Sequence, residues 1–332
     1  KVENFLNGRA QGKSIRGASS LAEFVDQLDK PRKVMLMIKA GEPVDEMIET
    51  LLPLLDPGDL IIDGGNSHFP DSERRTKYVE SKGLLYIGTG VSGGEEGALK
   101  GPSLMPGGSP GAWPLIKPIF QAIAAKVDGD SACCEWIGSG GAGHFVKMVH
   151  NGIEYGDMQL IAEIYQIMKF GLKMSNDEMH KVFSEWNEGE LDSYLIEITR
   201  DILSYKNEAG EYVIDLIQDR AGQKGTGKWT GIEALEQGVP LTLVVEAVFA
   251  RLLSSLKDTR VEAAKLYGIN PLQIDKAAIN ISDLRDALYA AKIVSYAQGF
   301  MLMKQSSELN SWDLQYGDIA MVWRGGCIIR QG

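Results

Sequence analysis

One stretch of the sequence carries five polar side chains at helical spacing. At about 100° per residue, they fall on one helix face within an arc of about 140°. They are an amine, an imidazole, a carboxamide, a carboxylate and a phenol, from Lys147, His150, Asn151, Glu154 and Tyr155. Amine, imidazole and carboxyl groups can exchange protons with a bound molecule. A solvated surface stripe is the alternative, but apolar residues and glycines fill the other positions, so we expect the polar face to line a cleft.

The first part of the chain alternates short apolar runs with helical patterns. The runs cover residues 33–38, 59–63 and 84–88, and the helical patterns cover 44–55 and 71–82. Such alternation predicts a parallel sheet with crossover helices. The ligand crevice of such a sheet lies beyond the carboxyl ends of its strands, where this sequence has small and polar residues.

Strand signals fade after about residue 140. A further short strand is predicted at 134–137, and helical patterns follow at 142–171, 177–187, 190–205, 240–267 and 282–308. The fold class is therefore α/β followed by all-α, with a division near residue 141.

Three glycine motifs suggest nucleotide sites at first sight. The dinucleotide-like pattern at 88–93 has no room for a long helix after it, and the one at 138–143 is better explained as a hinge and helix start. The P-loop-like string at 222–228 is followed by Trp229 in place of the magnesium-binding hydroxyl. None of the three predicts a phosphate loop of a known nucleotide-binding class.

Composition narrows the class of protein. The formal net charge is -11, which argues against a surface for nucleic acid or anionic membranes. Three cysteines without metal-ligand spacing indicate a reducing cytoplasm, and no apolar stretch approaches the length of a membrane span. The chain opens on Lys1 and closes on Gly332 without terminal signatures, so we expect segments on both sides.

Several longer strings resemble 6-phosphogluconate dehydrogenases, and the resemblance spans essentially the whole chain. The strings are Asp63-Gly-Gly-Asn-Ser, Gly90-Val-Ser-Gly-Gly-Glu-Glu-Gly-Ala, Gly101-Pro-Ser-Leu-Met-Pro-Gly-Gly, Gly143-His-Phe-Val-Lys-Met-Val-His-Asn-Gly-Ile-Glu-Tyr and Gly222-Gln-Lys-Gly-Thr-Gly-Lys-Trp-Thr. The resemblance implies an oxidoreductase that is a homodimer, lies in the cytoplasm and acts in the pentose phosphate pathway and gluconate utilisation. It would convert 6-phosphogluconate to ribulose 5-phosphate and CO2 with reduction of NADP.

The resemblance also implies domain limits. Residues 1–141 would be the remainder of a Rossmann-like dinucleotide-binding domain that lacks its first strand-turn-helix. Residues 142–332 would be a truncated helical domain for substrate binding and dimerisation.

Catalytic roles follow from the same resemblance. Lys147 would be the general base that takes the C3 hydroxyl proton, which requires a lysine pKa lowered by burial or neighbouring positive charge. As a lysinium it would then polarise the 3-keto group during loss of CO2. Glu154 would protonate C1 of the enediol. A divalent metal is not expected, because the lysine supplies the positive charge.

The resemblance assigns further residues to the substrate. Those for its oxygens and acid end are Asn66, Ser92, Gly93, Gly94, His150, Asn151 and Tyr155. Those for its phosphate are Lys224, Thr226 and Arg251, which by themselves would read as a solubilising loop and a snorkelling arginine.

The implied cofactor residues are Ile38, Lys39, Ala40 and Asn66, the last near the nicotinamide end. In the family, the Gly-rich turn and the residues for the adenosine 2′-phosphate precede this region, and a neighbouring subunit's tail completes the site. The isolated chain is therefore expected to be inactive, and the preference for NADP over NAD rests on the resemblance.

Two alternatives stay open. One is another β-hydroxyacid dehydrogenase that acts on an unphosphorylated acid, which would have no use for the phosphate residues. The other is a non-catalytic truncated chain or binding module.

Overall fold

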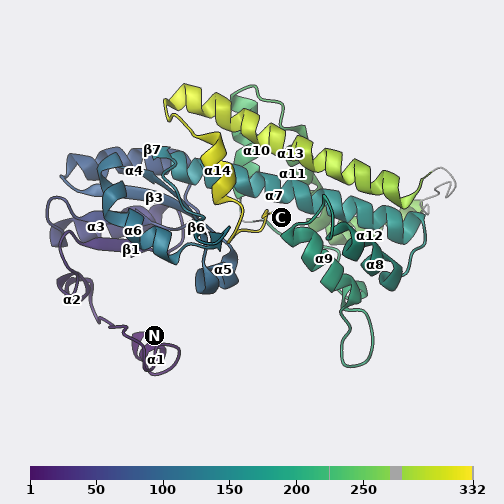
Figure 1. Ribbon diagram of the computed structural model, residues 1–332, viewed down its shortest axis with the longest axis horizontal. Helices are drawn as coiled ribbons and strands as arrows, with labels where there is room; N and C mark the ends of the chain where they lie inside the picture. Colours follow the sequence, from purple (N-terminus) through teal and green to yellow (C-terminus); the bar gives the residue numbers. More distant parts are fainter. Residues whose placement is uncertain (224, 270–278, 331–332) are drawn as a thin grey trace. The chain divides into compact units, whose positions relative to one another are not determined.

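The computed structural model describes residues 1–223, 225–269 and 279–330, and Figure 1 shows its ribbon. Contacts divide the chain into two compact units. The first contains residues 1–91, 104–122 and 135–145, and the second contains 92–103, 123–134 and the described residues from 146 onward. The domain limits 1–141 and 142–332 stay a prediction.

A five-stranded sheet forms the centre of the first unit. Its strand order is β1-β2-β3-β4-β7, and β1 pairs in parallel with β2, β2 with β3, and β4 with β7. The strands are β1 Lys33–Leu36, β2 Leu60–Asp63, β3 Leu85–Ser92, β4 Ser103–Gly108 and β7 Gly138–Ser139. The three apolar runs predicted as strands are confirmed.

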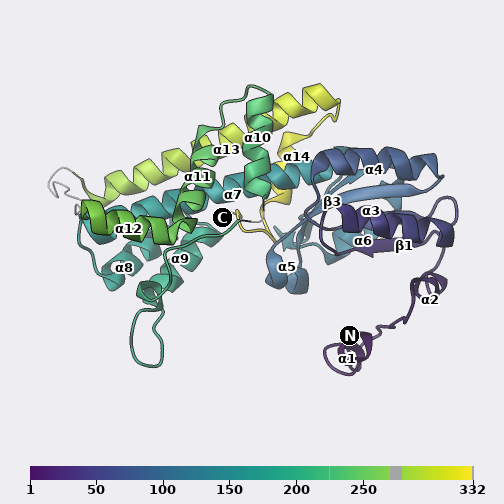
Figure 2. The same ribbon diagram turned by 180° about the vertical axis from the view of Figure 1, so that it is seen from behind.

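Helices cover this sheet, as Figures 1 and 2 show. The longer ones are α3 Glu42–Leu51, α4 Phe69–Ser81 and α6 Trp113–Ile123. All four residues of β2 are buried, as expected for a strand inside a parallel sheet. Apolar residues of α3 and α4, such as Ile48 and Val79, share one core with β1 to β3.

Two strand assignments differ from the prediction. The strand β4 was not predicted, because Pro106 and two glycines give Ser103–Gly108 the composition of a loop. Its six residues are nevertheless all buried. The strand predicted at 134–137 is displaced: the structure places the strand at the next two residues, in β7, and from the predicted range Ile137 N joins it by donating to Pro106 O of β4 at 2.9 Å.

Short elements complete this part of the chain. They are α1 Val2–Leu6, α2 Leu21–Asp26, α5 Gly94–Lys100, the 3-10 turns Leu52–Leu54 and Pro110–Ala112, and the antiparallel pair β5 Lys126–Val127 and β6 Ser131–Ala132.

Beyond residue 142 every named element in the described chain is helical. The elements are α7 Ala142–Gln166 with a π turn at Ile167–Gly171, α8 Asn176–Trp186, α9 Tyr194–Ser204, a 3-10 turn at Val213–Asp215, α10 Thr226–Glu236, α11 Thr242–Ser255, α12 Lys257–Tyr267, α13 Ile281–Asn310 and α14 Tyr316–Val322. The helix predicted at 240–267 is broken at Leu256, and α10 was not predicted. No helix among the described residues has the length and apolar character needed to cross a membrane.

Small residues bring the long helices of the second unit close together. Figures 1 and 2 show α13 running beside α7, and a Cβ at Gly299 would lie 2.6 Å from Ile153 Cδ1. A Cβ at Gly152 would likewise lie 2.8 Å from Thr230 Cγ2 on α10. Glycine at these positions therefore fixes how closely α7 approaches its neighbours. This packing sets the rotation of α7 about its axis, and with it the direction of the polar stripe, by which we mean the helix face that carries Lys147, His150, Asn151, Glu154 and Tyr155.

Candidate active site

Lys147 is a buried amine with two hydrogen-bond acceptors. Its side chain lies on the second turn of α7, and the residue is 7 % exposed. Nζ donates to Asn151 Oδ1 at 2.8 Å and to Ser92 Oγ at 3.0 Å. Burial lowers the pKa of Lys147 to about 8, against the opposing charge of Glu154. About one tenth of this amine is therefore neutral at pH 7, far more than for an ordinary lysine, and can accept a proton.

Asn151 connects the lysine to another helix. Its Nδ2 donates to Thr226 Oγ1 at 2.9 Å, and Thr226 is the first residue of α10. Thr230, one turn further, donates to Met148 O at 2.8 Å. The start of α10 is therefore fastened to α7 at two places around the lysine.

His150 and Glu154 occupy the same face of α7. His150 Nδ1 lies 3.2 Å from Asn151 Oδ1 and 4.0 Å from Glu154 Oε2. The His150 ring contacts Trp323 edge-on at 5.5 Å between centroids. Burial, reinforced by the charge of Lys147, holds the pKa of His150 well below its usual range, so the ring is neutral. A neutral imidazole serves as a hydrogen-bonding group here and adds no charge.

Ser92 ends β3, and the glycines after it turn the chain sharply. Gly93 adopts φ 103° and Gly94 adopts φ 61°, a region that favours glycine. A Cβ at Gly93 would lie 2.5 Å from Gly326 O, whereas one at Gly94 would meet open space. Gly326 O also accepts a 2.9 Å hydrogen bond from Ser103 N. The chain at Gly326 therefore supports the turn that carries Ser92.

Tyr155 and Arg251 form a second pair near the stripe. The Arg251 guanidinium lies 3.7 Å from the centre of the Tyr155 ring, and its Nη1 donates to Gly222 O at 3.0 Å. Stacking on an aromatic ring holds an arginine in place while leaving other donors for an anion. Lys224, predicted beside it, lies outside the described residues.

The predicted cofactor residues lie on loops of the first unit. In the parallel register Leu36 pairs with Asp63, so the loops after β1 and β2 leave the sheet at the same edge. Lys39 and Asn66 are exposed there, and Ile38 and Ala40 are half-buried.

The two loops approach each other through bare backbone. A Cβ at Gly65 would lie 3.1 Å from Ile38 O, and one at Gly64 would lie 2.6 Å from both Met35 Cε and Met37 Sδ. An edge of parallel strands with small residues and one exposed lysine fits part of a dinucleotide.

Sequence reasoning missed a buried ion pair on the reactive helix. Lys292 Nζ of α13 donates to Asp157 Oδ2 of α7 at 2.7 Å, and both side chains are buried. Asp157 follows Tyr155 by two positions and lies just beyond the predicted polar arc of α7. Its nearness to that arc was the one feature of the sequence that could have identified it. Its partner is 135 residues away in sequence, and no spacing rule could identify it.

The structure thus brings together Lys147, Ser92, His150, Asn151 and Thr226 through hydrogen bonds, with Glu154 at the edge of this group and Tyr155 with Arg251 beside it. In the described part of the chain, no three His, Cys, Asp or Glu side chains gather as metal ligands. The group combines one base, one carboxyl and several neutral hydrogen-bonding groups, a set suited to moving protons on a polyhydroxylated substrate.

Two family models match this chain. One, described as the NAD binding domain of 6-phosphogluconate dehydrogenase, matches residues 1–138, and one described as the C-terminal domain of 6-phosphogluconate dehydrogenase matches residues 143–332.

Curated relatives agree with these matches. The chain is 60 % identical over 331 residues to the decarboxylating 6-phosphogluconate dehydrogenase of Schizosaccharomyces pombe, covering 99 % of this chain and 67 % of the relative. It is 59 % identical over 332 residues to the human enzyme of that name, covering 99 % of this chain and 69 % of the relative.

Solved structures show the same similarity. A Plasmodium falciparum 6-phosphogluconate dehydrogenase superposes with a TM-score of 0.93 at 47 % identity, over 99 % of this chain and 71 % of that one. Its description names complexes with NADP+ and with 6-phosphogluconate. A Salmonella typhimurium 3-hydroxyisobutyrate dehydrogenase, at 19 % identity, TM-score 0.55 and coverage of 78 % of this chain and 84 % of that one, shares the fold alone.

Proposed function

Because this chain belongs to the 6-phosphogluconate dehydrogenase family, we propose that the protein containing it converts 6-phosphogluconate and NADP to ribulose 5-phosphate, CO2 and NADPH. The observation that carries the proposal is the environment of Lys147, a buried amine with a pKa of about 8. Ser92 and Asn151 both accept hydrogen bonds from it.

Lys147 has the chemistry of a base that becomes an acid. As a neutral amine it takes the C3 hydroxyl proton while the C3–H bond breaks. The bound nicotinamide supplies the acceptor for that hydrogen and its electron pair. The lysinium then donates its proton to the C3 carbonyl oxygen as CO2 leaves, which gives an enediol. Asn151 and Ser92 accept hydrogen bonds from the charged form and hold it in place.

Glu154 completes the proton transfers. Its carboxyl protonates C1 of the enediol while Lys147 takes back the hydroxyl proton, so Lys147 ends as the ammonium and Glu154 as the carboxylate. Return of one proton from the amine to the carboxylate restores both groups for the next turnover. The position two turns along the same helix face supports this role. His150, Asn151 and Tyr155 would hold substrate oxygens, with Ser92, Gly93 and Gly94 at the acid end and Asn66 beside the nicotinamide.

The phosphate would be held by Thr226 and Arg251 together with Lys224. The stacked and hydrogen-bonded Arg251 supports this assignment, because an anchored guanidinium binds phosphate with little further ordering. Ile38, Lys39, Ala40 and Asn66 would contact the dinucleotide. We also propose a cytoplasmic homodimer in which the partner's tail completes the site. The chain spans about two thirds of the length of its curated relatives, and we propose that it is inactive by itself.

The decisive experiment is kinetic and uses the full-length protein. Lys147→Met should lower kcat for NADPH formation by about 10²- to 10⁴-fold, the usual contribution of a general base. The exposed Lys228, on α10, provides the matched control Lys228→Met, which should leave kcat unchanged. A Lys147→Met protein that turns over at the original rate would remove the proposed base.

A substrate comparison tests the alternative of an unphosphorylated acid. Gluconate lacks the phosphate, so kcat/KM for it should fall at least about 10³-fold below that for 6-phosphogluconate, as charge-assisted contacts are lost. Equal kcat/KM values would favour a different β-hydroxyacid dehydrogenase activity. No turnover of either acid by the full-length protein would indicate a non-catalytic chain.

A further inference from the structure

Arg75 is an arginine enclosed within the first unit. It lies on α4, and its side chain is 1 % exposed. A guanidinium carries five N–H donors in a fixed planar arrangement, and burying it without partners would be costly. The positions of its partners therefore show what it holds in place.

One side of Arg75 reaches the loop after β1. Nε donates to Asp45 Oδ1 at 2.8 Å and Nη2 donates to Asp45 Oδ2 at 2.9 Å, a bidentate pair with the first turn of α3. Nη2 also donates to the carbonyl of Gly41 at 2.9 Å. Gly41 directly follows Lys39 and Ala40, so this contact fixes the end of the loop that carries them.

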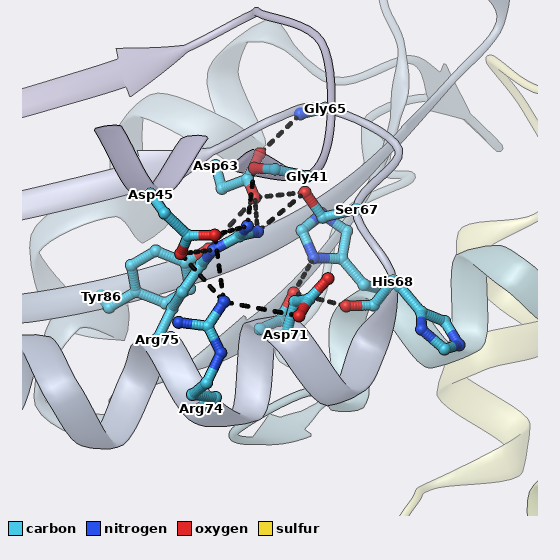
Figure 3. Close-up of polar contacts among 12 residues, drawn as sticks. Gly41, Asp45, Asp63, Gly65, Ser67, His68, Asp71, Arg74, Arg75 and Tyr86 are labelled. Atoms are coloured by element: carbon cyan, nitrogen blue, oxygen red, sulfur yellow. Dashed lines mark hydrogen bonds and ion pairs between the residues drawn. The ribbon is translucent and has the colours of Figure 1, made fainter. Parts of the chain in front are cut away.

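The other side of Arg75 reaches the loop after β2, as Figure 3 shows. Nη1 donates to Ser67 Oγ at 3.3 Å and lies 3.5 Å from Asp63 Oδ2. Asp63 in turn accepts from Ser67 Oγ at 2.6 Å, from Gly65 N at 3.0 Å and from the Tyr86 hydroxyl at 3.1 Å.

The residues on both sides of Asn66 are therefore tied to Asp63, Gly65 through its backbone N–H and Ser67 through its hydroxyl. One guanidinium thus connects two loops that lie 34 and 8 residues from it in sequence.

The electrostatics of the cluster favour a rigid connection. Hydrogen bonds from Arg75 hold the pKa of the Asp45 carboxyl below its usual range. Burial opposes the charge on Arg75, but its bonds to Asp45 outweigh this effect and raise the guanidinium pKa. Both shifts favour the charged forms, so the pair is charged near neutral pH.

We propose that Arg75 is a positioning residue for the dinucleotide, which sets the separation of the loops bearing Lys39, Ala40 and Asn66. The proposal rests on the proposed function, because those residues are assigned to the cofactor there. Arg75 touches neither substrate nor cofactor in this role. It acts through Gly41, Ser67 and Asp63, so its loss should weaken nucleotide binding and leave the substrate's own residues in place.

The test measures binding of each ligand separately, in the full-length protein. Arg75→Met should raise the Kd for NADPH at least about tenfold, since misplacing a binding group by about 1 Å is that costly. The Kd for 6-phosphogluconate, measured without nucleotide, should stay within about twofold of its original value. Calorimetric titration gives both constants without turnover.

Arg74 is a close control for charge and position. It lies next to Arg75 on α4 and donates to the same carboxylate, Asp45 Oδ1, at 2.9 Å, but it is exposed, and its hydrogen bonds within the described residues are to Asp45 and Asp71. Arg74→Met should leave the Kd for NADPH unchanged. If Arg75→Met does not fold, Ser67→Ala takes its place, because it removes the link from Arg75 and Asp63 to the β2 loop alone. Ser67→Ala should also raise the Kd for NADPH and leave the Kd for 6-phosphogluconate unchanged.

The outcomes separate this inference from the proposed function. If the wild-type full-length protein does not bind NADPH, the proposed function itself is contradicted. If the wild-type protein binds NADPH and the Arg75→Met or Ser67→Ala variant binds it equally well, the positioning role alone is overturned. If Arg75→Met weakens binding of NADPH and of 6-phosphogluconate equally and also lowers the Tm, Arg75 contributes to general stability, and the positioning role is overturned as well.

Discussion

Lys147 donates a 2.8 Å hydrogen bond to Asn151 one turn further along α7, and Asn151 passes a second bond, of 2.9 Å, to Thr226 on α10. The proposed base and Thr226, one of the residues proposed to hold the phosphate, are therefore joined by a single carboxamide. Because an amide has both an acceptor and donors, it can serve the lysine and the threonine at once. A substitution at Thr226 should therefore also alter the position of the Lys147 amine, and a substitution at Lys147 should alter the position of Thr226.

The pH dependence of turnover should report the lysine. Burial lowers the pKa of Lys147 to about 8, and only the neutral amine, present above that pH, can take a proton. The value of kcat/KM for 6-phosphogluconate should therefore fall about tenfold per pH unit below about pH 8. Initial rates of NADPH formation across a pH series give this limb. A profile flat from pH 6 to 8 would contradict the assignment.

Glu154→Gln should move that limb toward lower pH. The charge of Glu154 raises the pKa of Lys147, although burial lowers it more, so removing the charge leaves the amine easier to deprotonate. The same change should lower kcat, because the proposed acid is lost. Glu163→Gln, at an exposed position of the same helix, is the control and should leave the profile in place. If Glu154→Gln instead shifted the acid side of the kcat/KM profile to higher pH, the charge interaction between Glu154 and Lys147 would be contradicted.

Thr226→Val should affect substrate binding more than turnover. It removes the acceptor of Asn151 and the hydroxyl offered to the phosphate, so KM for 6-phosphogluconate should rise about tenfold or more while kcat falls less. Thr199→Val, on the distant helix α9, removes only a bond to a backbone carbonyl and serves as the control. An unchanged KM for Thr226→Val would exclude a role in holding the phosphate.

Two adjacent glycines should respond differently to the same substitution. Gly93→Ala combines positive φ with a Cβ only 2.5 Å from Gly326 O, and should lower the free energy of unfolding by about 2–5 kcal/mol. Gly94→Ala has open space and should cost only about 1 kcal/mol for its backbone conformation. Denaturant unfolding measures both. Equal losses would show that the contact with Gly326 is unimportant.

The buried pair Asp157–Lys292 should be sensitive to loss of one partner. Lys292→Met leaves the Asp157 carboxylate without its 2.7 Å cationic partner, and should reduce the free energy of unfolding by about 3–5 kcal/mol. The double change Asp157→Leu with Lys292→Met removes both charges and should recover most of that loss. A double variant as unstable as the single one would point to lost packing as the cause.

The reactive stripe could be predicted because helix period alone decides which side chains of a 25-residue helix share a face. Its partners could not. Ser92 and Thr226 meet the stripe across separations of 55 and 75 residues, which tertiary packing determines. Arg75 gave no signal either, since a buried arginine on a charged helix resembles a surface one in sequence. The strand β4 was hidden for a related reason: burial overrides the loop-like composition of its glycines and proline.

The position of β1 at the end of the strand order has a consequence of its own. Among the described residues no strand pairs with its outer side, so a row of main-chain amide and carbonyl groups there is left for another segment to pair with. Val34 and Leu36 are buried beneath that row, and Met35 between them is 39 % exposed. Such a side accepts an added strand readily, whether from the same polypeptide or from a second molecule. Recombinant pieces of this protein should therefore be checked for self-association before any activity is compared.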